Sequence, residues 1–199
     1  MIIIDLEQGS DLWFKEKLGK PSASNASKII TNEGKVSKQQ EGYLYELAAE
    51  RITGKQEESY QNMNMLVGNE REQESREVYE FMQKVKVKQV GVIYKDEQKK
   101  FLCSPDGLIS KNYGLEMKNP LPKTQVKYLL DNKLPSEYFG QCQFSMYVTG
   151  FKFWMFMSYV PGMKPLIIKV ERDEVYIRRL AVELELFVEK LEEITNQLK

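Results

Sequence analysis

The sequence predicts an α/β domain in which a central mixed β-sheet is flanked by helices. Segments whose apolar residues recur every three or four positions alternate with segments in which they recur every second position. The chain has 199 residues, of which 42% are hydrophobic, enough for one sizeable core but short for two. No internal repeat, low-complexity tract or Pro/Gly-rich linker divides it, so we expect residues 1–199 to form a single domain.

Helical periodicity marks five segments. They are residues 41–53, which Gly54 should end, then 63–82, 123–132, 136–148 and a long helix that closes the chain. The closing helix has one apolar face, made by Leu180, Leu184, Phe187, Leu191, Ile194 and Leu198. We expect this face to pack on the sheet instead of forming a coiled coil.

Strand-like alternation begins in residues 84–94, where Lys84, Lys86 and Lys88 alternate with valines. These lysines are interpreted as a solvated strand face, with a DNA-contacting stripe as the alternative. The runs FLCSPDGLI and GLEMKNP flank SKNYG in the pattern of a hairpin, and further strands are expected at FKFWMFMSYV and PLIIKVERD.

The composition excludes several kinds of chemistry. The chain has no histidine, which removes Ser-His-Asp and Cys-His nucleophilic sites and histidine-ligated zinc. Cys103 and Cys142 are too few for a disulfide framework or for an iron–sulfur cluster held by this chain alone. The 29 basic and 29 acidic residues balance, which permits a local basic channel but argues against a uniformly basic surface. We see no secretory signal and no membrane span, and expect a soluble protein in a reducing cytoplasm.

Asp106, Glu116 and Lys118 form the constellation that carries chemistry. Strand alternation puts Glu116 and Lys118 on one face of GLEMKNP, with Met117 directed into the core and Asp106 across the hairpin. The two carboxylates and the backbone carbonyl of Met117 would supply oxygen ligands for Mg²⁺, with Mn²⁺ as a substitute. Lys118 would orient or deprotonate a water molecule, a role that requires a pKa lowered by the positive charge of the nearby metal.

The three-residue pattern is weak by itself. PDG is also an ordinary turn, and Glu116 and Lys118 could pair on the solvated face of an edge strand. The surrounding sequence decides between these readings.

SPDGLI followed by GLEMKNP resembles the active-site core of the phage lambda exonuclease family, also called YqaJ-like viral recombinases, within the PD-(D/E)xK nucleases. The resemblance covers nearly the whole chain and includes the blocks EQGSDLWFKEKLGKPSAS, VGNEREQESREVYEF, EYFGQCQFSMYVTG and VERDEVYIRRL, in the family's order. It implies a restriction-endonuclease-like core.

The resemblance also implies individual roles. Asp106 and Glu116 would hold metal and Lys118 would be the catalytic lysine, while Glu72 would approach the metal through a second ion or its water. Without the resemblance, Glu72 reads as one surface glutamate among several. Gln141 would line the site and position the water or the phosphate. Tyr138, three residues earlier, could support Gln141, although a core tyrosine is the expected role.

A pocket for a terminal 5′-phosphate is implied at Ser24, Ser104 and Lys17. Lys17 departs from the family pattern, which has arginine there, and this puts in doubt how strongly a phosphorylated end is required. Alternatively, Ser22 and Ser24 cap a helix starting near Asn25 and Lys17 is solvated. Trp13 is expected to be a core or interface anchor.

The resemblance implies a Mg²⁺-dependent 5′-to-3′ exonuclease that acts on linear double-stranded DNA, releases 5′-mononucleotides and leaves 3′ overhangs. It further implies a ring-shaped homotrimer, a single-strand annealing recombinase as partner, and a role in phage or prophage recombination in the bacterial cytoplasm. The alternatives are a site-specific endonuclease or junction resolvase of the same fold, and a catalytically silent DNA-end-binding protein.

Overall fold

The computed structural model describes residues 1–56 and 71–199. The elements follow in the order β1 (Ile2–Ile4), α1 (Asp11–Lys17), η1 (Ala23–Asn25), α2 (Ala26–Ile29), α3 (Gln40–Thr53), α5 (Glu72–Gln83), β2 (Val92–Tyr94), β3 (Leu102–Cys103), β4 (Gly107–Ile109), β5 (Tyr113–Lys118), α6 (Pro122–Asp131), η2 (Ser136–Tyr138), α7 (Phe139–Thr149), β6 (Phe153–Ser158), β7 (Leu166–Glu171) and α8 (Glu174–Leu198). Among the helices of these residues, none is both long enough and apolar enough to cross a bilayer.

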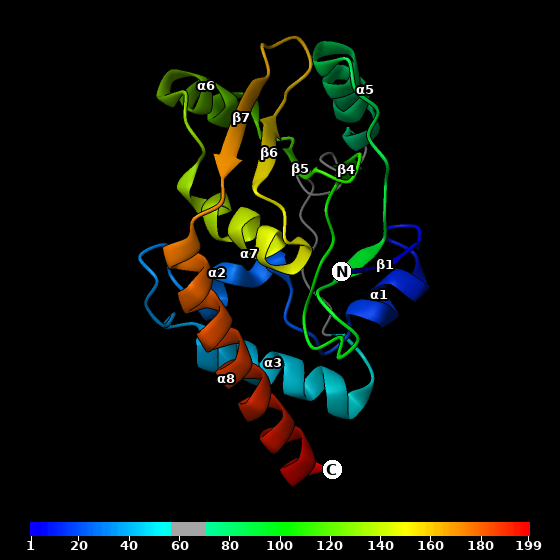
Figure 1. The fold of residues 1–199 in the computed structure, drawn as a ribbon, viewed down its shortest axis with the longest axis vertical. Helices are drawn as coiled ribbons and strands as arrows, with labels where there is room; N and C mark the ends of the chain where they lie inside the picture. Colours follow the sequence, from blue (N-terminus) through cyan, green and yellow to red (C-terminus); the bar gives the residue numbers. More distant parts are fainter. Residues whose placement is uncertain (57–70) are drawn as a thin grey trace.

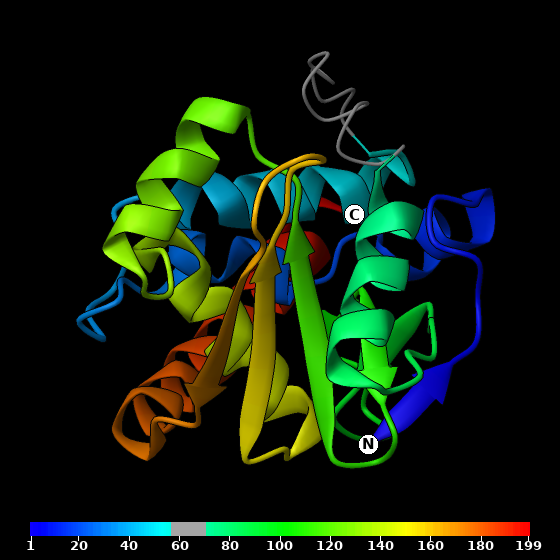
Figure 2. The same ribbon diagram turned by 90° about the horizontal axis from the view of Figure 1, so that it is seen from above.

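A mixed four-stranded sheet lies between helices, as expected (Figures 1 and 2). Its order is β4-β5-β6-β7, in which only β5 and β6 run parallel. α5 covers one face through Tyr79, which packs with Leu115 and Met117 of β5. α7 packs on the other side, where Trp154 and Phe156 of β6 join the main core. Strand β5 is therefore an interior strand with both faces buried.

A second sheet, β1-β2-β3, is antiparallel and was not predicted as a separate unit. The run FLCSPDGLI is divided between the two sheets: Leu102–Cys103 pairs with β2, whereas Gly107–Ile109 forms the predicted hairpin with β5. The intervening residues 104–106 carry the chain from one sheet to the other. This crossing brings Asp106 to the end of the hairpin.

The prediction of a strand through residues 84–91 is wrong. Lys84 has a left-handed conformation, with φ of 54°, and ends α5. The carboxylate of Glu80 accepts hydrogen bonds from the Val87 N–H at 2.7 Å and from Lys86 Nζ at 3.0 Å. Because the Glu80 carboxylate binds the Val87 N–H, this backbone donor does not pair with a neighbouring strand. The segment makes only an isolated bridge at Lys88, and the regular strand is confined to β2.

The predicted helices at 41–53, 123–132 and 136–148 are confirmed as α3, α6 and η2 with α7, and Gly54 ends α3 in a left-handed conformation. The helix predicted for 63–82 is α5 in its second half, while positions 63–70 lie outside the described residues.

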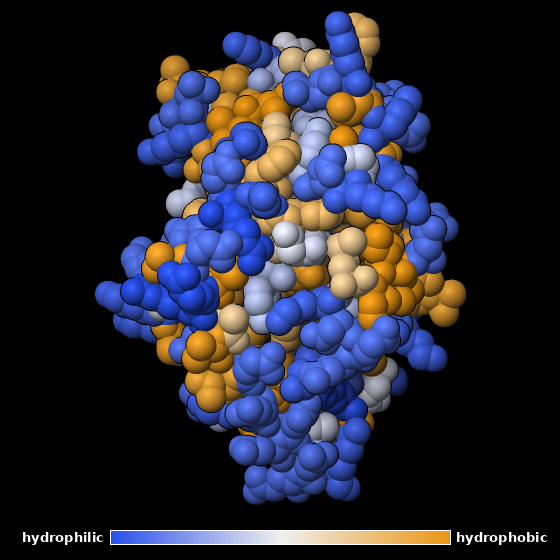
Figure 3. Space-filling model, viewed as in Figure 1, coloured by the Kyte–Doolittle hydropathy of each residue, from blue (hydrophilic) through white to orange (hydrophobic). Residues whose placement is uncertain are grey.

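The closing helix α8 does not pack mainly on the sheet. Its main neighbours are α3 and α7, and Phe187 stacks on Tyr43 of α3 with ring centroids 5.5 Å apart. Leu198 at its end is exposed. The opposite face of α8 is hydrophilic toward the C-terminus (Figure 3). The apolar face was therefore predicted correctly except at Leu198, but helices cover it in place of strands.

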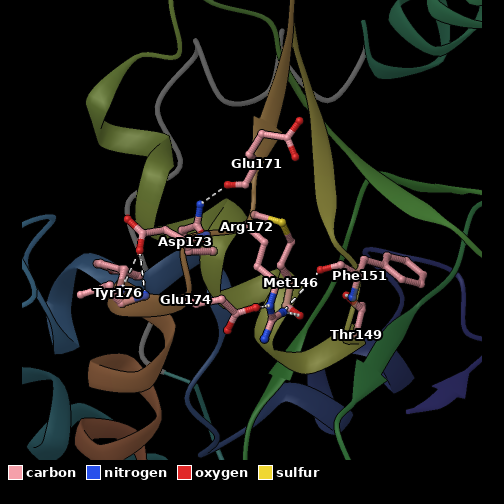
Figure 4. Close-up of polar contacts among 10 residues, drawn as sticks. Met146, Thr149, Phe151, Glu171, Arg172, Asp173, Glu174 and Tyr176 are labelled. Atoms are coloured by element: carbon pink, nitrogen blue, oxygen red, sulfur yellow. Dashed lines mark hydrogen bonds and ion pairs between the residues drawn. The ribbon is translucent and has the colours of Figure 1, made fainter.

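A cluster of hydrogen bonds connects β7, α8 and α7 (Figure 4). Buried Gln143 of α7 donates to the Glu171 carbonyl at 2.8 Å and accepts from the Asp173 N–H at 2.9 Å. The guanidinium of Arg172 donates to the Met146 carbonyl near the end of α7. Because these bonds are directional, they fix the position of α7 relative to the sheet.

Candidate active site

A cavity of about 210 Å³ lies where α1, α5, α7, β5 and the crossing between the two sheets meet. Every side chain selected from the sequence as a site residue lines it. The lining residues are Gln8, Trp13, Lys17, Ser22, Ala23, Ser24, Glu72, Ser104, Asp106, Glu116, Lys118 and Gln141. The fold thus gathers residues separated by more than 130 positions in the chain.

Glu116 and Lys118 project from one face of β5 toward α7. Lys118 Nζ lies 2.5 Å from Glu116 Oε1, and Gln141 Nε2 donates to the same oxygen at 2.7 Å. Glu116 is only 2% exposed, so its position on the solvated face of an edge strand is excluded. Tyr138 stacks on Phe156, a core position, and its ring centroid lies 5.2 Å from Lys118 Nζ.

Asp106 approaches the same cluster from the crossing segment. One of its carboxylate oxygens accepts a hydrogen bond from the Met117 N–H. Burial raises the pKa of Asp106 well above its usual range, and the negative charges of Glu116 and Glu72 add to this effect, with Lys118 opposing it. The use of the Met117 carbonyl as a metal ligand stays a prediction.

The pKa of Lys118 is raised within this cluster of side chains, whereas the lowered pKa was predicted for Lys118 beside the positive charge of a bound metal ion. Burial alone would lower it, but the carboxylates of Glu116 and Asp106 outweigh burial. Lys118 is therefore a protonated hydrogen-bond donor here. Its geometry suits it to orient a water molecule or to stabilise charge on a phosphate, and a role as base would require a further positive charge nearby.

The donor set fits a hard divalent cation. The buried carboxylates of Asp106 and Glu116 lie in one cavity where Lys118 pairs with Glu116, so their mutual repulsion is only partly compensated, and oxygen donors are the ligands that Mg²⁺ prefers. In residues 1–56 and 71–199, no three acidic or cysteine side chains gather as a complete metal cage. Glu72 lines the cavity but pairs with Arg76 at 2.7 Å. Water would therefore complete the coordination of a bound ion.

Three residues predicted to bind the 5′-phosphate, Lys17, Ser24 and Ser104, also line the cavity. Lys17 Nζ lies 3.7 Å from the centroid of the Trp13 ring. Burial lowers the pKa of Lys17 to about 8, with Glu50 opposing the shift. Lys17 is thus held in the structure and not simply solvated.

The two serines differ in their bonding. Ser104 Oγ donates to the Gly91 carbonyl and accepts from Trp13 Nε1 at 3.0 Å, so its hydroxyl must turn before it can donate to a phosphate. Ser24 is exposed, and its hydroxyl lies 3.1 Å from that of Ser22. Ser22 precedes η1 but makes no side-chain capping bond, so the capping alternative has no support.

Trp13 packs on the apolar cluster of the smaller sheet, the anchoring role expected for it. Sequence reasoning did not select Gln8, which lines the cavity. Gln8 Nε2 donates to the carbonyls of Val90 and Pro105, both at 2.8 Å, and so ties the N-terminal segment to the crossing. The only sequence signal for Gln8 was its place in the block EQGSDLWF.

A family model, the YqaJ-like viral recombinase domain, matches residues 12–152, which is more than half of the chain. The chain belongs to this family. No curated protein matches the chain.

Solved structures extend the likeness beyond the family segment. An alkaline exonuclease (LHK-Exo) from Laribacter hongkongensis is 29% identical with a TM-score of 0.86, covering 95% of this chain and 96% of that one. The same enzyme in complex with dAMP matches equally well, covering 96% of each chain. A phage-related exonuclease from Haemophilus somnus 129PT shares the fold, at 13% identity and a TM-score of 0.69, over 90% of this chain and 96% of that one. The PD-(D/E)xK fold class is thereby confirmed, and the chain is a nuclease of a kind that normally uses a divalent metal.

Replacing Asp106 with Asn should stabilise the metal-free protein. Asn keeps the oxygen that accepts from the Met117 N–H but removes the buried charge. Since the folded-state pKa of Asp106 is raised, folding stability should fall as pH rises from about 4 toward that pKa, and the variant should escape this loss. Urea unfolding in chelator should therefore show an advantage of Asp106→Asn that is larger at pH 8 than at pH 5. A variant less stable than the wild type at both pH values would contradict the buried charge repulsion.

Proposed function

We propose that this protein is a Mg²⁺-dependent 5′-to-3′ exonuclease on linear double-stranded DNA, with residues 1–199 forming one nuclease domain. The observation that carries the proposal is the buried cluster of Asp106, Glu116, Lys118 and Gln141 in one cavity of a YqaJ-family chain. A silent end-binding protein would not need two buried carboxylates whose charges one lysine only partly compensates, because such charges cost stability unless a function keeps them.

Each residue has a definable task. Asp106 and Glu116 would hold Mg²⁺, with Mn²⁺ as a substitute, and Glu72 would contribute through a second ion or through water. The bound ion would polarise the phosphoryl oxygen and lower the pKa of water. Lys118, protonated, would donate to the attacking water or to a phosphate oxygen, and Gln141 would keep Glu116 oriented through its 2.7 Å hydrogen bond.

The direction and products are proposed from the relatives. The alkaline exonuclease LHK-Exo has been solved with dAMP, which supports release of mononucleotides by this chain. Lys17, Ser24 and Ser104 would recognise the terminal 5′-phosphate, and removal of the 5′-terminated strand would leave a 3′ overhang. The 5′-phosphate would bind at one end of the cavity and the phosphodiester bond would be cleaved at the other. Degradation would therefore run only in the 5′-to-3′ direction.

We further propose a ring-shaped homotrimer that encloses DNA, a single-strand annealing recombinase as partner, and a place in phage or prophage recombination in the bacterial cytoplasm. A ring reconciles zero net charge with DNA binding, because basic groups need only line the hole. The alternative function is an endonuclease or junction resolvase of the same fold, which would not require the Lys17 pocket.

The reaction class is tested with end-labelled linear and closed circular duplexes, with and without Mg²⁺. The wild type should degrade only linear DNA, only with the metal, and from 5′ ends. Asp106→Ala should abolish digestion because a metal ligand is lost. Nicking of circles would indicate the endonuclease, and undiminished cleavage by Asp106→Ala would remove the assignment.

Lys17 should make the preference for 5′-phosphorylated ends depend on pH. Below its pKa of about 8, Lys17 is charged and attracts the phosphate dianion; above it the charge is lost. The kcat/KM ratio of phosphorylated to hydroxyl ends should therefore fall up to about tenfold per pH unit above this value.

The matched control is Lys17→Arg, because arginine stays charged and binds phosphate with two prongs. For Lys17→Arg, the kcat/KM ratio of phosphorylated to hydroxyl ends should be larger and should not change with pH. Identical ratios in both proteins at every pH would show that Lys17 does not contact the phosphate.

A further inference from the structure

Buried Ser75 of α5 and half-buried Asn119 form a hydrogen bond next to the candidate active site. The Ser75 hydroxyl lies 2.5 Å from Asn119 Oδ1 and 2.9 Å from the Arg71 carbonyl, and Ser75 is fully buried. Asn119 directly follows Lys118 at the end of β5. The bond therefore joins α5 to the strand that carries Glu116 and Lys118, across 44 positions of sequence.

This bond is one of the directional contacts that position Glu72. Glu72 is the first residue of α5, and Ser75 follows it by three positions, which puts the two on the same side of the helix. Tyr79 presses this side against β5 through apolar contacts, but such contacts are not directional and tolerate sliding along the helix axis. A side-chain hydrogen bond with strict geometry fixes that position.

Other contacts of Glu72 do not relate it to β5. Arg76 donates to Glu72 Oε1 at 2.7 Å, but both residues belong to α5 and move together. Gln89, with its amide oriented to face Arg76, accepts from that guanidinium at 2.6 and 3.1 Å and so fixes the arginine. Arg76 and Gln89 together can hold the rotamer of the Glu72 carboxylate. The distance of this carboxylate from Asp106 and Glu116 depends instead on the position of α5 along its own axis relative to β5.

We propose that Ser75 and Asn119 are positioning residues that hold the Glu72 carboxylate within reach of the divalent cation at Asp106 and Glu116. The inference rests on the proposed function, since it needs a cation at that pair. Groups that orient metal ligands typically contribute about 10- to 100-fold to metal affinity. The loss of this bond should therefore weaken metal binding and leave the reacting groups themselves intact.

The experiment is a Mn²⁺ titration of the DNA-free protein by calorimetry or electron paramagnetic resonance. Ser75→Ala and Asn119→Ala should each weaken Mn²⁺ binding about 10-fold or more. The double variant should be no weaker than either single one, because the Ser75–Asn119 bond that relates α5 to β5 is lost in all three. Asn119 is only half-buried, so its variant tests the bond even if Ser75→Ala folds poorly. The Mn²⁺ concentration for half-maximal hydrolysis should rise, and kcat at saturating metal should recover.

Tyr159→Phe is the matched control. It removes another hydrogen bond between α5 and the sheet, from Tyr159 Oη to Glu74 at 2.8 Å, on a different side of the helix. Its Mn²⁺ affinity should equal that of the wild type, whereas Glu72→Ala should weaken binding as Ser75→Ala does.

Three results would overturn the proposal: wild-type affinity in Ser75→Ala and Asn119→Ala, wild-type affinity in Glu72→Ala, or an equal loss in Tyr159→Phe. Each is distinct from failure of the proposed function. That failure would appear as Mn²⁺ binding and hydrolysis undiminished in Asp106→Ala.

Discussion

The structure is organised around the carboxylates of Asp106 and Glu116, which are buried in one cavity where Lys118 pairs with Glu116. Charges removed from water are costly unless they are paired, and here one positive charge faces two negative ones. Burial and the neighbouring charge of Glu116 raise the pKa of Asp106, and the two carboxylates raise the pKa of Lys118 against the effect of burial. A dication would correct the imbalance of charge, so the arrangement is better suited to the metal-bound protein than to the metal-free one.

The rest of the fold holds this cluster in place. The chain crosses from the small sheet to the mixed sheet at residues 104–106, which delivers Asp106 to the backbone of β5. On the opposite side, hydrogen bonds from Gln143 and Arg172 fix α7. Gln141 of this helix donates a hydrogen bond to Glu116. Gln8 ties the N-terminal segment to the crossing. These directional bonds fix the elements that carry the charged residues.

Local rules were sufficient to predict that Asp106, Glu116 and Lys118 lie close together. The period of a strand put Glu116 and Lys118 on one face, and the turn residues of SKNYG indicated the hairpin that brings Asp106 near them. Those relations span about a dozen residues. The helix period likewise identified the apolar face of α8.

Relations that depend on tertiary contacts could not be predicted. The apolar run FLCSPDGLI reads as one strand, and only pairing with β2 shows that Leu102–Cys103 belongs to another sheet. Lysine–valine alternation indicates a strand, but Glu80 takes the backbone donor that a ladder would use. The apolar face of α8 does not say whether helices or strands cover it. The Ser75–Asn119 bond joins positions 44 residues apart, and no local pattern marks either partner.

The most direct test of the buried carboxylate pair as a cation site is anomalous diffraction at the manganese edge from crystals soaked in MnCl₂. The account predicts a peak bounded by carboxylate oxygens of Asp106 and Glu116, at roughly 2.0–2.2 Å from each. Lys118 Nζ should move away from Glu116 as the ion replaces it. A peak elsewhere, or a cavity in which Lys118 keeps its contact with Glu116 and excludes manganese at saturating concentration, would contradict the account.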